Sequence, residues 1–173
     1  MEDLSTRRRI YEEILLNPGL HFRELQRRLD MPVGMLEYHL NVLLKDELIV
    51  SREDGRYIRF FANTYMSHQE RKIMGFLRNE IVRKIIIFLL ENGRVKQRDI
   101  ANFVGISPST LSYHLNKLVK GGILQREIEG RERYYSLKDP KIMARTIIKY
   151  RKSFLDSLVD NFVKLWEKRE RNI

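Results

Sequence analysis

The sequence predicts a mainly α-helical chain with small β-hairpins, in which two tandem copies of one domain are followed by a long C-terminal helix. Two observations support this prediction. A shift of 75 residues, without a gap, superposes residues 36–43 on residues 111–118, and one register holds over about 55 residues. Within each copy, apolar residues at helical spacing precede a short apolar run and a turn signal. The register indicates a tandem duplication, so each element is expected twice.

Each copy is expected to begin with two helices. The first helix stops at residues 17–19 in one copy and at residues 92–93 in the other, because Asn-Pro-Gly and Asn-Gly are strong helix breakers. The second helix is expected near residues 22–29 and 97–103. A short turn then leads into a third helix in each copy.

The third helix of the second copy, residues 107–120, has the clearest signal. Ser107 is a suitable N-cap, and Pro108 suits the first helical position, where no backbone donor is needed. Apolar side chains fall at i, i+4 and i+7 on one face: Leu111, Leu115 and Leu118. The other side is polar, with Ser109, Thr110, Ser112, Tyr113, Asn116 and Lys117. Small polar tips, one aromatic ring and one cation suit a DNA major groove.

A β-hairpin is expected after the third helix of each copy. Apolar runs at residues 48–50 and 123–124 are followed by turns at 54–55 and 129–130, and then by return strands at 57–61 and 133–137. Three helices followed by a hairpin make the plan of a winged helix, which is a helix-turn-helix with a β-wing.

Residues 107–118, with the following Gly121-Gly122-Ile123-Leu124, strongly resemble the recognition helix and next strand of ArsR-like winged-helix regulators. The first copy resembles them less closely. Together the two copies resemble the tandem winged-helix transcription regulators of archaea over about residues 5–138. The resemblance implies binding to double-stranded DNA. Because ArsR-like proteins commonly dimerise through terminal helices, it also implies a homodimer.

Four segments are expected: a first winged-helix domain at 1–65, a helical linker at 66–82, a second winged-helix domain at 83–138 and an amphipathic C-terminal helix at 139–173. The linker is interpreted as one helix that runs on into the second domain. The apolar stripe of the last helix consists of Ile148, Leu155, Leu158, Phe162 and Leu165. A helix of this length buries such a face, either against a dimer partner or by docking on the chain's own first domain.

The composition favours a polyanionic partner. Among 173 residues the net charge is +10 and the sequence pI is near 9.9, which is typical of nucleic-acid binders. The absence of cysteine excludes disulfides and thiolate metal sites. No apolar run approaches the roughly 20 residues of a membrane span, so a cytoplasmic location and no contact with membranes are expected.

The two copies differ in charge. Residues 1–65 carry a net charge of −1, residues 66–140 carry +6 and residues 141–173 carry +5. The third helix of the first copy has an apolar start and places Glu37 where the second copy has Ser112. We therefore expect the first domain to be the weaker DNA reader.

Cations outside the third helix are expected on the DNA backbone or in the minor groove. Arg131 and Arg133 flank the wing turn of the second copy, where an arginine can enter a minor groove. Residues at or before the second helix of that copy suit phosphate contacts: Arg94, Lys96 and Arg98. The first wing offers Arg52, Arg56 and Arg59. The predicted DNA-binding set is Ser109, Thr110, Ser112, Tyr113, Asn116, Lys117, Lys120, Arg98, Arg131, Arg133 and Arg56.

Neither catalysis nor a metal site is expected. The sequence has no phosphate-cradling glycine loop, nucleophile elbow or credible paired-carboxylate motif, so it predicts no enzyme activity and no cofactor. His39 and His114, one in each copy, are interpreted as half-buried side chains that steady the helix-turn-helix rather than as metal ligands.

The leading hypothesis is a dimeric, sequence-specific repressor of transcription. Two alternatives stay open at this point. One is a DNA-coating, nucleoid-associated protein of low sequence specificity, which the general basic excess permits. The other is a winged-helix adaptor for protein partners, which the acidic first copy suits. The sequence identifies no small-molecule effector.

Overall fold

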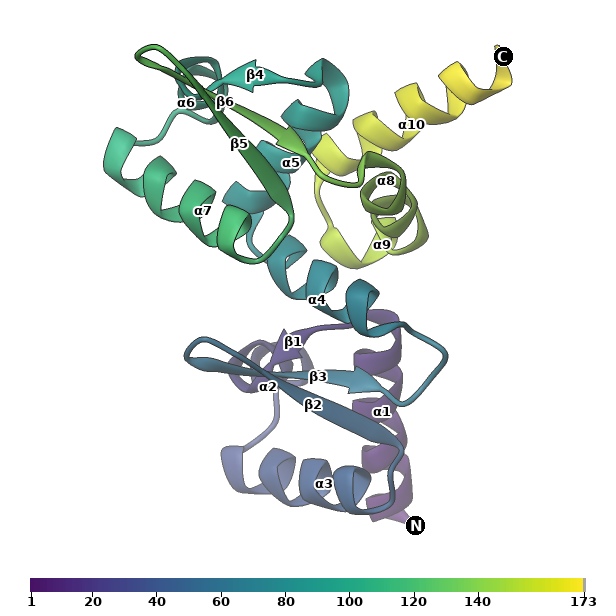
Figure 1. Cartoon of the computed structure of the whole chain (residues 1–173). Helices are drawn as coiled ribbons and strands as arrows, with labels where there is room; N and C mark the ends of the chain where they lie inside the picture. Colours follow the sequence, from purple (N-terminus) through teal and green to yellow (C-terminus); the bar gives the residue numbers. More distant parts are fainter. Residues whose placement is uncertain (173) are drawn as a thin grey trace. The chain divides into compact units, whose positions relative to one another are not determined.

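The computed structural model describes residues 1–172, which divide into two compact units. The first unit is Met1–Gly75, and the second begins at Phe76. The division falls inside one helix, α4 (His68–Leu77), two residues before its end. Each unit contains one complete copy of the repeat (Figure 1).

The N-terminal unit packs three helices against a three-stranded antiparallel sheet (Figure 1). Its elements before α4 are α1 (Glu2–Leu16), β1 (Leu20–His21), α2 (Phe22–Leu29), α3 (Val33–Lys45), β2 (Ile49–Asp54) and β3 (Tyr57–Ala62). The strand order is β1-β3-β2, and Ser51 lies opposite Phe60. The core combines apolar side chains from all three helices with the sheet: Ile10, Ile14, Leu25, Leu36, Leu40, Ile49 and Phe60.

The C-terminal unit repeats this plan and adds three helices. Its elements after α4 are α5 (Glu80–Asn92), β4 (Val95–Lys96), α6 (Gln97–Val104), α7 (Pro108–Lys120), β5 (Leu124–Glu129), β6 (Glu132–Leu137), α8 (Pro140–Lys149), α9 (Arg151–Phe154) and α10 (Ser157–Arg171). The strand order is β4-β6-β5. Every element from β4 to β6 begins and ends 75 residues after its counterpart in β1 to β3. The duplication therefore holds in three dimensions without a gap, and the predicted mainly helical fold with two β-wings is confirmed.

Helix α7 forms as its sequence predicts. The Ser107 hydroxyl accepts a hydrogen bond from the Thr110 backbone N–H at 3.3 Å, and Pro108 occupies the first turn. This cap satisfies one of the backbone donors that a helix start leaves unpaired. The leucine stripe is fully buried, with 0% exposure at Leu111, Leu115 and Leu118.

The prediction of one long C-terminal helix is wrong. The segment consists of α8, α9 and α10, separated at Tyr150 and at Leu155–Asp156. Leu155 adopts a left-handed conformation, with a φ of 50°, and its side chain is 86% exposed. Leu165, another member of the predicted stripe, is 52% exposed. The buried apolar face consists instead of Met143, Ala144, Ile147, Phe154, Val159, Phe162 and Val163.

The interpretation of the linker as one continuous helix is also wrong. Helix α4 ends at Leu77, and α5 begins at Glu80 under a cap from Asn79. The Asn79 side-chain oxygen accepts from the backbone N–H groups of Ile81 at 2.9 Å and Val82 at 3.2 Å. A new N-cap in the middle of an apolar periodic run ends one helix and starts another.

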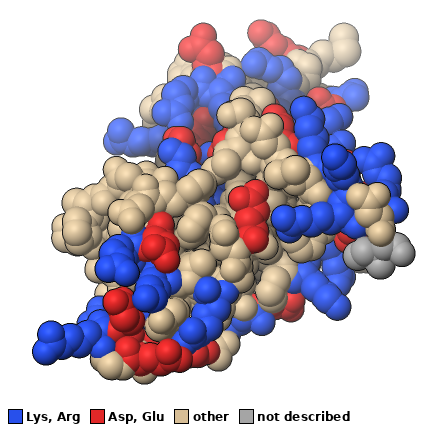
Figure 2. All heavy atoms as spheres, turned by 90° about the horizontal axis from the view of Figure 1, so that it is seen from above, with Lys and Arg blue, Asp and Glu red and all other residues tan. Residues whose placement is uncertain are grey.

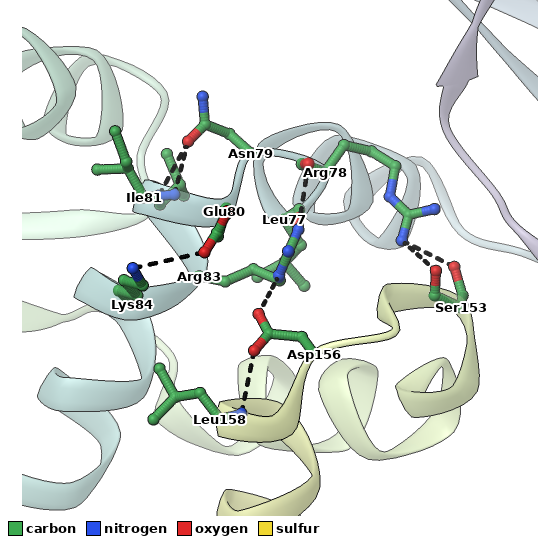
Figure 3. Close-up of polar contacts among 11 residues, drawn as sticks. Leu77, Arg78, Asn79, Glu80, Ile81, Arg83, Lys84, Ser153, Asp156 and Leu158 are labelled. Carbon is green, nitrogen blue, oxygen red and sulfur yellow. Dashed lines mark hydrogen bonds and ion pairs between the residues drawn. The ribbon is translucent and has the colours of Figure 1, made fainter. Parts of the chain in front are cut away.

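A buried arginine joins the junction between α4 and α5 to the C-terminal helices (Figure 3). Arg83 on α5 is 8% exposed, and its Nη1 donates to the carbonyl oxygens of Leu77 at 2.9 Å and Arg78 at 3.1 Å. Its Nε donates to the Asp156 carboxylate at 2.9 Å, and its guanidinium lies 5.3 Å from the Phe154 ring centroid. One side chain thus caps the end of α4 and joins α5 to the start of α10.

Gly121 is expected to tolerate no larger side chain. A Cβ at this position would lie 2.6 Å from Cζ of Phe76, which is closer than two carbons can approach. We expect Gly121→Ala to lower the free energy of unfolding of the C-terminal unit by about 1–3 kcal/mol, because the Phe76 ring must move. Gly34→Ala is the matched control, since a Cβ there meets nothing within 4 Å and alanine favours a helix. Equal effects of the two variants in denaturant titrations would contradict the expectation.

Candidate nucleic-acid interface

Helix α7 presents a polar and basic surface to solvent. Its exposed polar and basic residues are Ser109, Thr110, Tyr113, Asn116, Lys117 and Lys120. Tyr113 is 61% exposed, and α7 contains no acidic residue. The leucine stripe fixes the orientation of this surface because its three side chains are buried in the core. Six of the seven predicted site residues on α7 therefore lie exposed on one helix.

Ser112 differs from the prediction that it points outward. It is half-buried, and its hydroxyl accepts a hydrogen bond from Nε2 of Gln97 at 3.2 Å. Gln97 opens α6, so this contact joins the first turn of α6 to α7. Ser112 is placed to hold the two helices of the helix-turn-helix rather than to face a ligand.

A polar network links α6, α7 and the wing of the C-terminal unit. The Tyr135 hydroxyl donates to Oε1 of Gln97 at 3.2 Å and accepts from Nε of Arg126 at 3.0 Å. The second arm of Arg126 donates to Oδ1 of Asn116 on α7. Gln97 and Arg126 did not emerge as site residues from sequence. For Arg126 the signal is the expected pairing of the two hairpin strands, which places it directly opposite Tyr135, whereas Gln97 lies on α6 and has no such signal.

The second wing carries two unconstrained arginines at its tip. Arg131 and Arg133 are exposed and flank the turn at Gly130, which has a φ of 61°. Neither forms an ion pair with another residue among 1–172. Because side chains alternate across a strand, Arg133 lies on the same face of the hairpin as Tyr135 and Arg126. Arg98 is also exposed, on the first turn of α6.

Arg94 is not available for the phosphate contact that the sequence predicts. It forms ion pairs with Glu127 at 3.0 Å and Glu129 at 2.5 Å, and its guanidinium lies 3.7 Å from the centroid of the Tyr134 ring. Two carboxylates and an aromatic face already satisfy this cation. Arg94 therefore fastens β5 to the start of β4 and is a poor candidate for phosphate contact.

The first wing has fewer available cations than predicted. Arg59 is 8% exposed, forms an ion pair with Asp54 at 2.7 Å and donates to the Gly19 carbonyl oxygen at 2.9 Å. Arg52 donates to the His68 carbonyl oxygen at 3.4 Å. Arg56 is exposed, and it forms no ion pair with the residues that the structure describes. Of the three wing arginines, Arg56 alone keeps the predicted availability.

The exposed surface of α3 is apolar where that of α7 is polar. Val33, Met35 and Tyr38 are 52%, 46% and 56% exposed. On the wing face that carries Arg126 and Arg133 in the second copy, the first copy has Ser51 and Ile58 at the corresponding positions. The first domain thus lacks counterparts of Lys117, Arg126 and Arg133. It keeps Arg23, Lys45 and Arg56 at the positions of Arg98, Lys120 and Arg131.

Charge by itself does not mark an interface. On the face drawn in Figure 2, Lys and Arg side chains form separate clusters, which acidic and uncharged side chains interrupt. The candidate interface therefore rests on particular elements of the C-terminal unit, namely α7, the start of α6 and the tip of the β5–β6 hairpin.

The surroundings of His39 indicate a role in packing. His39 is 3% exposed, and its Nδ1 accepts from Nε of Arg7 at 3.5 Å. No group of three or more His, Cys, Asp or Glu side chains that could hold a metal ion occurs among residues 1–172. No helix in this range is long and apolar enough to cross a bilayer.

His114 makes the stability of the C-terminal unit pH-dependent. Burial, together with the neighbouring Lys117 ammonium, lowers the pKa of His114 below its ordinary value of 6.5. The unfolded chain therefore takes up a proton before the folded chain does, and stability falls as the pH decreases through 6.5. We expect His114→Gln to lose less free energy of unfolding than wild type between about pH 8 and about pH 5.5. Identical pH slopes in denaturant titrations would contradict this.

The fold and this surface define a class: a tandem winged helix-turn-helix protein with one exposed polar and basic recognition-helix surface. Residues 4–74 match a family described as an N-terminal HTH domain, and residues 78–125 match the winged helix-turn-helix DNA-binding family. The chain therefore contains two helix-turn-helix domains, of which the second matches a winged helix-turn-helix DNA-binding family. The predicted tandem winged-helix organisation, with its resemblance to an archaeal regulator, is confirmed.

Several known proteins are similar to this chain over part of its length. An uncharacterized HTH-type transcriptional regulator of Methanocaldococcus jannaschii, MJ1398, is 34% identical over 135 residues, which are 78% of this chain and 34% of that protein. The cadmium resistance transcriptional regulatory protein CadC of Listeria innocua is 36% identical over 41% of this chain and 62% of its own length. The chain thus spans about a third of the first of these relatives. The transcriptional repressor BigR of Xylella fastidiosa superposes with a TM-score of 0.44 at 20% identity, over 48% of this chain and 84% of that chain.

Proposed function

We propose that this chain is a sequence-specific DNA-binding repressor that acts as a homodimer and reads DNA mainly through its C-terminal unit. The observation that supports this most strongly is the surface of α7, where hydroxyl, amide, phenol and ammonium groups are exposed together and no carboxylate intervenes. Such groups form hydrogen bonds with base edges in the major groove, and they contact phosphates on either side of it.

In the proposed complex, α7 lies in the major groove. Ser109 and Thr110 lie at the helix N-terminus, where backbone N–H groups attract a phosphate. Tyr113 and Asn116 meet base edges, and Lys117 and Lys120 neutralise the backbone. Arg131 and Arg133 reach the adjacent minor groove, whose potential is the most negative part of the duplex. Arg98 adds a phosphate contact.

Dimerisation would place two α7 helices on successive turns of one DNA face, about 34 Å apart or a multiple of it. The C-terminal helices are the candidate contact, because Leu155 and Leu165 remain 86% and 52% exposed beside the buried face of α10. Sedimentation equilibrium tests this directly. We expect a dimer that Leu165→Glu converts to a monomer while the far-ultraviolet circular dichroism is unchanged.

One binding experiment separates the repressor from its alternatives. The affinity for a selected oligonucleotide and for random duplex is measured over a range of salt concentrations. A specific regulator keeps a ratio of affinities of about a thousand or more, and its affinity falls steeply with salt because it releases counterions. A DNA-coating protein gives a ratio near one. An adaptor for protein partners binds neither DNA, and that result would refute the proposal.

A further inference from the structure

We propose that the N-terminal unit binds a small organic cation with an apolar stem, a short alkylguanidinium, in a groove between α3 and the wing sheet. The groove has a volume of about 310 Å³ and is open to solvent. Its apolar lining consists of Phe22, Val33, Leu40, Leu44 and Phe60, and its polar lining consists of Glu37 and Asn41. This volume lies at the lower end of the range for small-molecule sites. Of the lining residues that the structure describes, Glu37 alone is charged.

The second copy shows what fills the corresponding space. A shift of 75 residues converts Glu37, Asn41 and Phe60 to Ser112, Asn116 and Tyr135. There, Arg126 extends across the site, donates to the Tyr135 hydroxyl at 3.0 Å and to Oδ1 of Asn116, and lies 5.4 Å from the Tyr135 ring centroid. The residue that corresponds to Arg126 is Ser51, which lies opposite Phe60. The groove therefore lies where the other copy holds its own guanidinium.

The first copy retains the groups that hold a guanidinium. Asn41 corresponds to Asn116 and offers the same side-chain acceptor. Phe60 corresponds to Tyr135 and offers an aromatic ring face, to which a cation is attracted. Glu37 replaces a serine and adds a carboxylate, which a guanidinium binds through two parallel hydrogen bonds. The apolar walls suit the methylene stem of such a ligand.

The same features argue against an anionic ligand. Glu37 repels a phosphate or carboxylate, and none of the lining residues is a cation. The vacant space corresponds to one arginine side chain exchanged for serine, so the ligand is compact. Among cations, a planar guanidinium matches the Asn, aromatic and carboxylate arrangement better than a spherical ammonium does.

The test is a titration of the whole chain with n-butylguanidine, followed by ¹H–¹⁵N NMR. We expect saturable shifts at the amides of Glu37, Asn41 and Phe60, in the millimolar range that suits so small a ligand. The corresponding amides of Ser112, Asn116 and Tyr135 are the internal control and are expected not to move. The uncharged 1-pentanol is expected to bind at least about tenfold more weakly, because it lacks the ion pair with Glu37.

Two variants locate the site. Ser51→Arg supplies an internal guanidinium, as Arg126 does, and is expected to weaken binding at least about tenfold, whereas Ser51→Ala leaves it unchanged. Ser51 is exposed, so both variants are compatible with the fold. Glu37→Gln, which removes the charge, is expected to weaken binding to a similar extent. Unaltered affinity in Ser51→Arg, or no saturable shift in wild type, would overturn the proposal.

The titration needs no DNA, so its outcome is independent of the proposed repressor function. A third titration uses N-acetyl-arginine methylamide, an arginine in a peptide-like setting. If this probe binds at least about tenfold more tightly than n-butylguanidine, the groove accepts an arginine of a protein partner instead, and the small-molecule proposal fails.

Discussion

Reversing the charge of both wing arginines, Arg131→Glu with Arg133→Glu, is expected to weaken binding to the selected oligonucleotide by about a hundredfold. Each substitution removes a cation from the most negative part of the duplex and adds a carboxylate that phosphates repel. The dependence of log affinity on log salt should also become less steep by about two, since two fewer counterions are released. Fluorescence anisotropy at several salt concentrations measures both quantities.

Two comparisons show whether this loss belongs to the second wing. Arg56→Glu, at the first wing, is expected to weaken binding by less than about threefold, because Ile58 replaces the second wing arginine and the exposed start of α3 is apolar. Lys141→Glu with Arg145→Glu changes the net charge of the same unit equally, at exposed positions of α8. Equal losses in the wing and α8 variants would mean that net charge alone controls affinity. Equal losses for the two wings would refute the asymmetry between the domains.

Asp156→Ala is expected to lower the free energy of unfolding of the C-terminal unit by about 3–5 kcal/mol, because it leaves the charge of Arg83 buried without its partner. The Arg83 and Asp156 side chains are only 10% and 13% exposed, so water can replace little of the lost interaction. Asp156 also caps α10, since its Oδ1 accepts from the Leu158 backbone N–H at 3.0 Å. Denaturant titrations followed by circular dichroism measure the loss.

Asp156→Asn separates these two contributions. The amide oxygen can still cap α10, whereas the negative charge is gone, so we expect a loss smaller than that of the alanine variant. Glu12→Ala is the control for an ordinary ion pair. Its partner Arg8 is 80% exposed, so water screens the pair, and we expect Glu12→Ala to lower the free energy of unfolding far less than Asp156→Ala does. A loss in Asp156→Ala no larger than this would show that the buried contact contributes little.

The repeat, the helix starts and the recognition face follow from sequence because each depends on neighbouring residues. Ser107 and Pro108 specify where α7 begins, and the leucine stripe specifies which side faces outward. The break between α9 and α10 at Leu155 could not be predicted from sequence. Leu155 matches the helical apolar spacing, and its left-handed conformation depends on how α9 and α10 pack, which periodicity does not show.

The sequence also does not show which charged side chains already have partners within the chain and which remain available to a ligand. Arg94 and Arg131 look alike in a list of cations near the wing. Only the structure shows that Glu127 and Glu129 on β5 already bind Arg94, whereas Arg131 projects from the tip without an ion pair among the described residues. Helical spacing places Ser112 on the polar side of α7, but its hydrogen-bond partner Gln97 lies on a different helix. Such contacts depend on tertiary neighbours and on side-chain length.

Because the two copies correspond without a gap, a surface side chain of one copy can be exchanged for the side chain at the corresponding position of the other. Because α3 and α7 have the same length and follow turns of the same length, surface residues of one can be transplanted to the other without moving the main chain. A chain with the α7 surface on both helices would contain two readers of the same specificity. In the proposed function the natural chain keeps a single reader. The exposed start of α3 is apolar where α7 is polar, so duplication here has produced two surfaces of different chemistry from one scaffold.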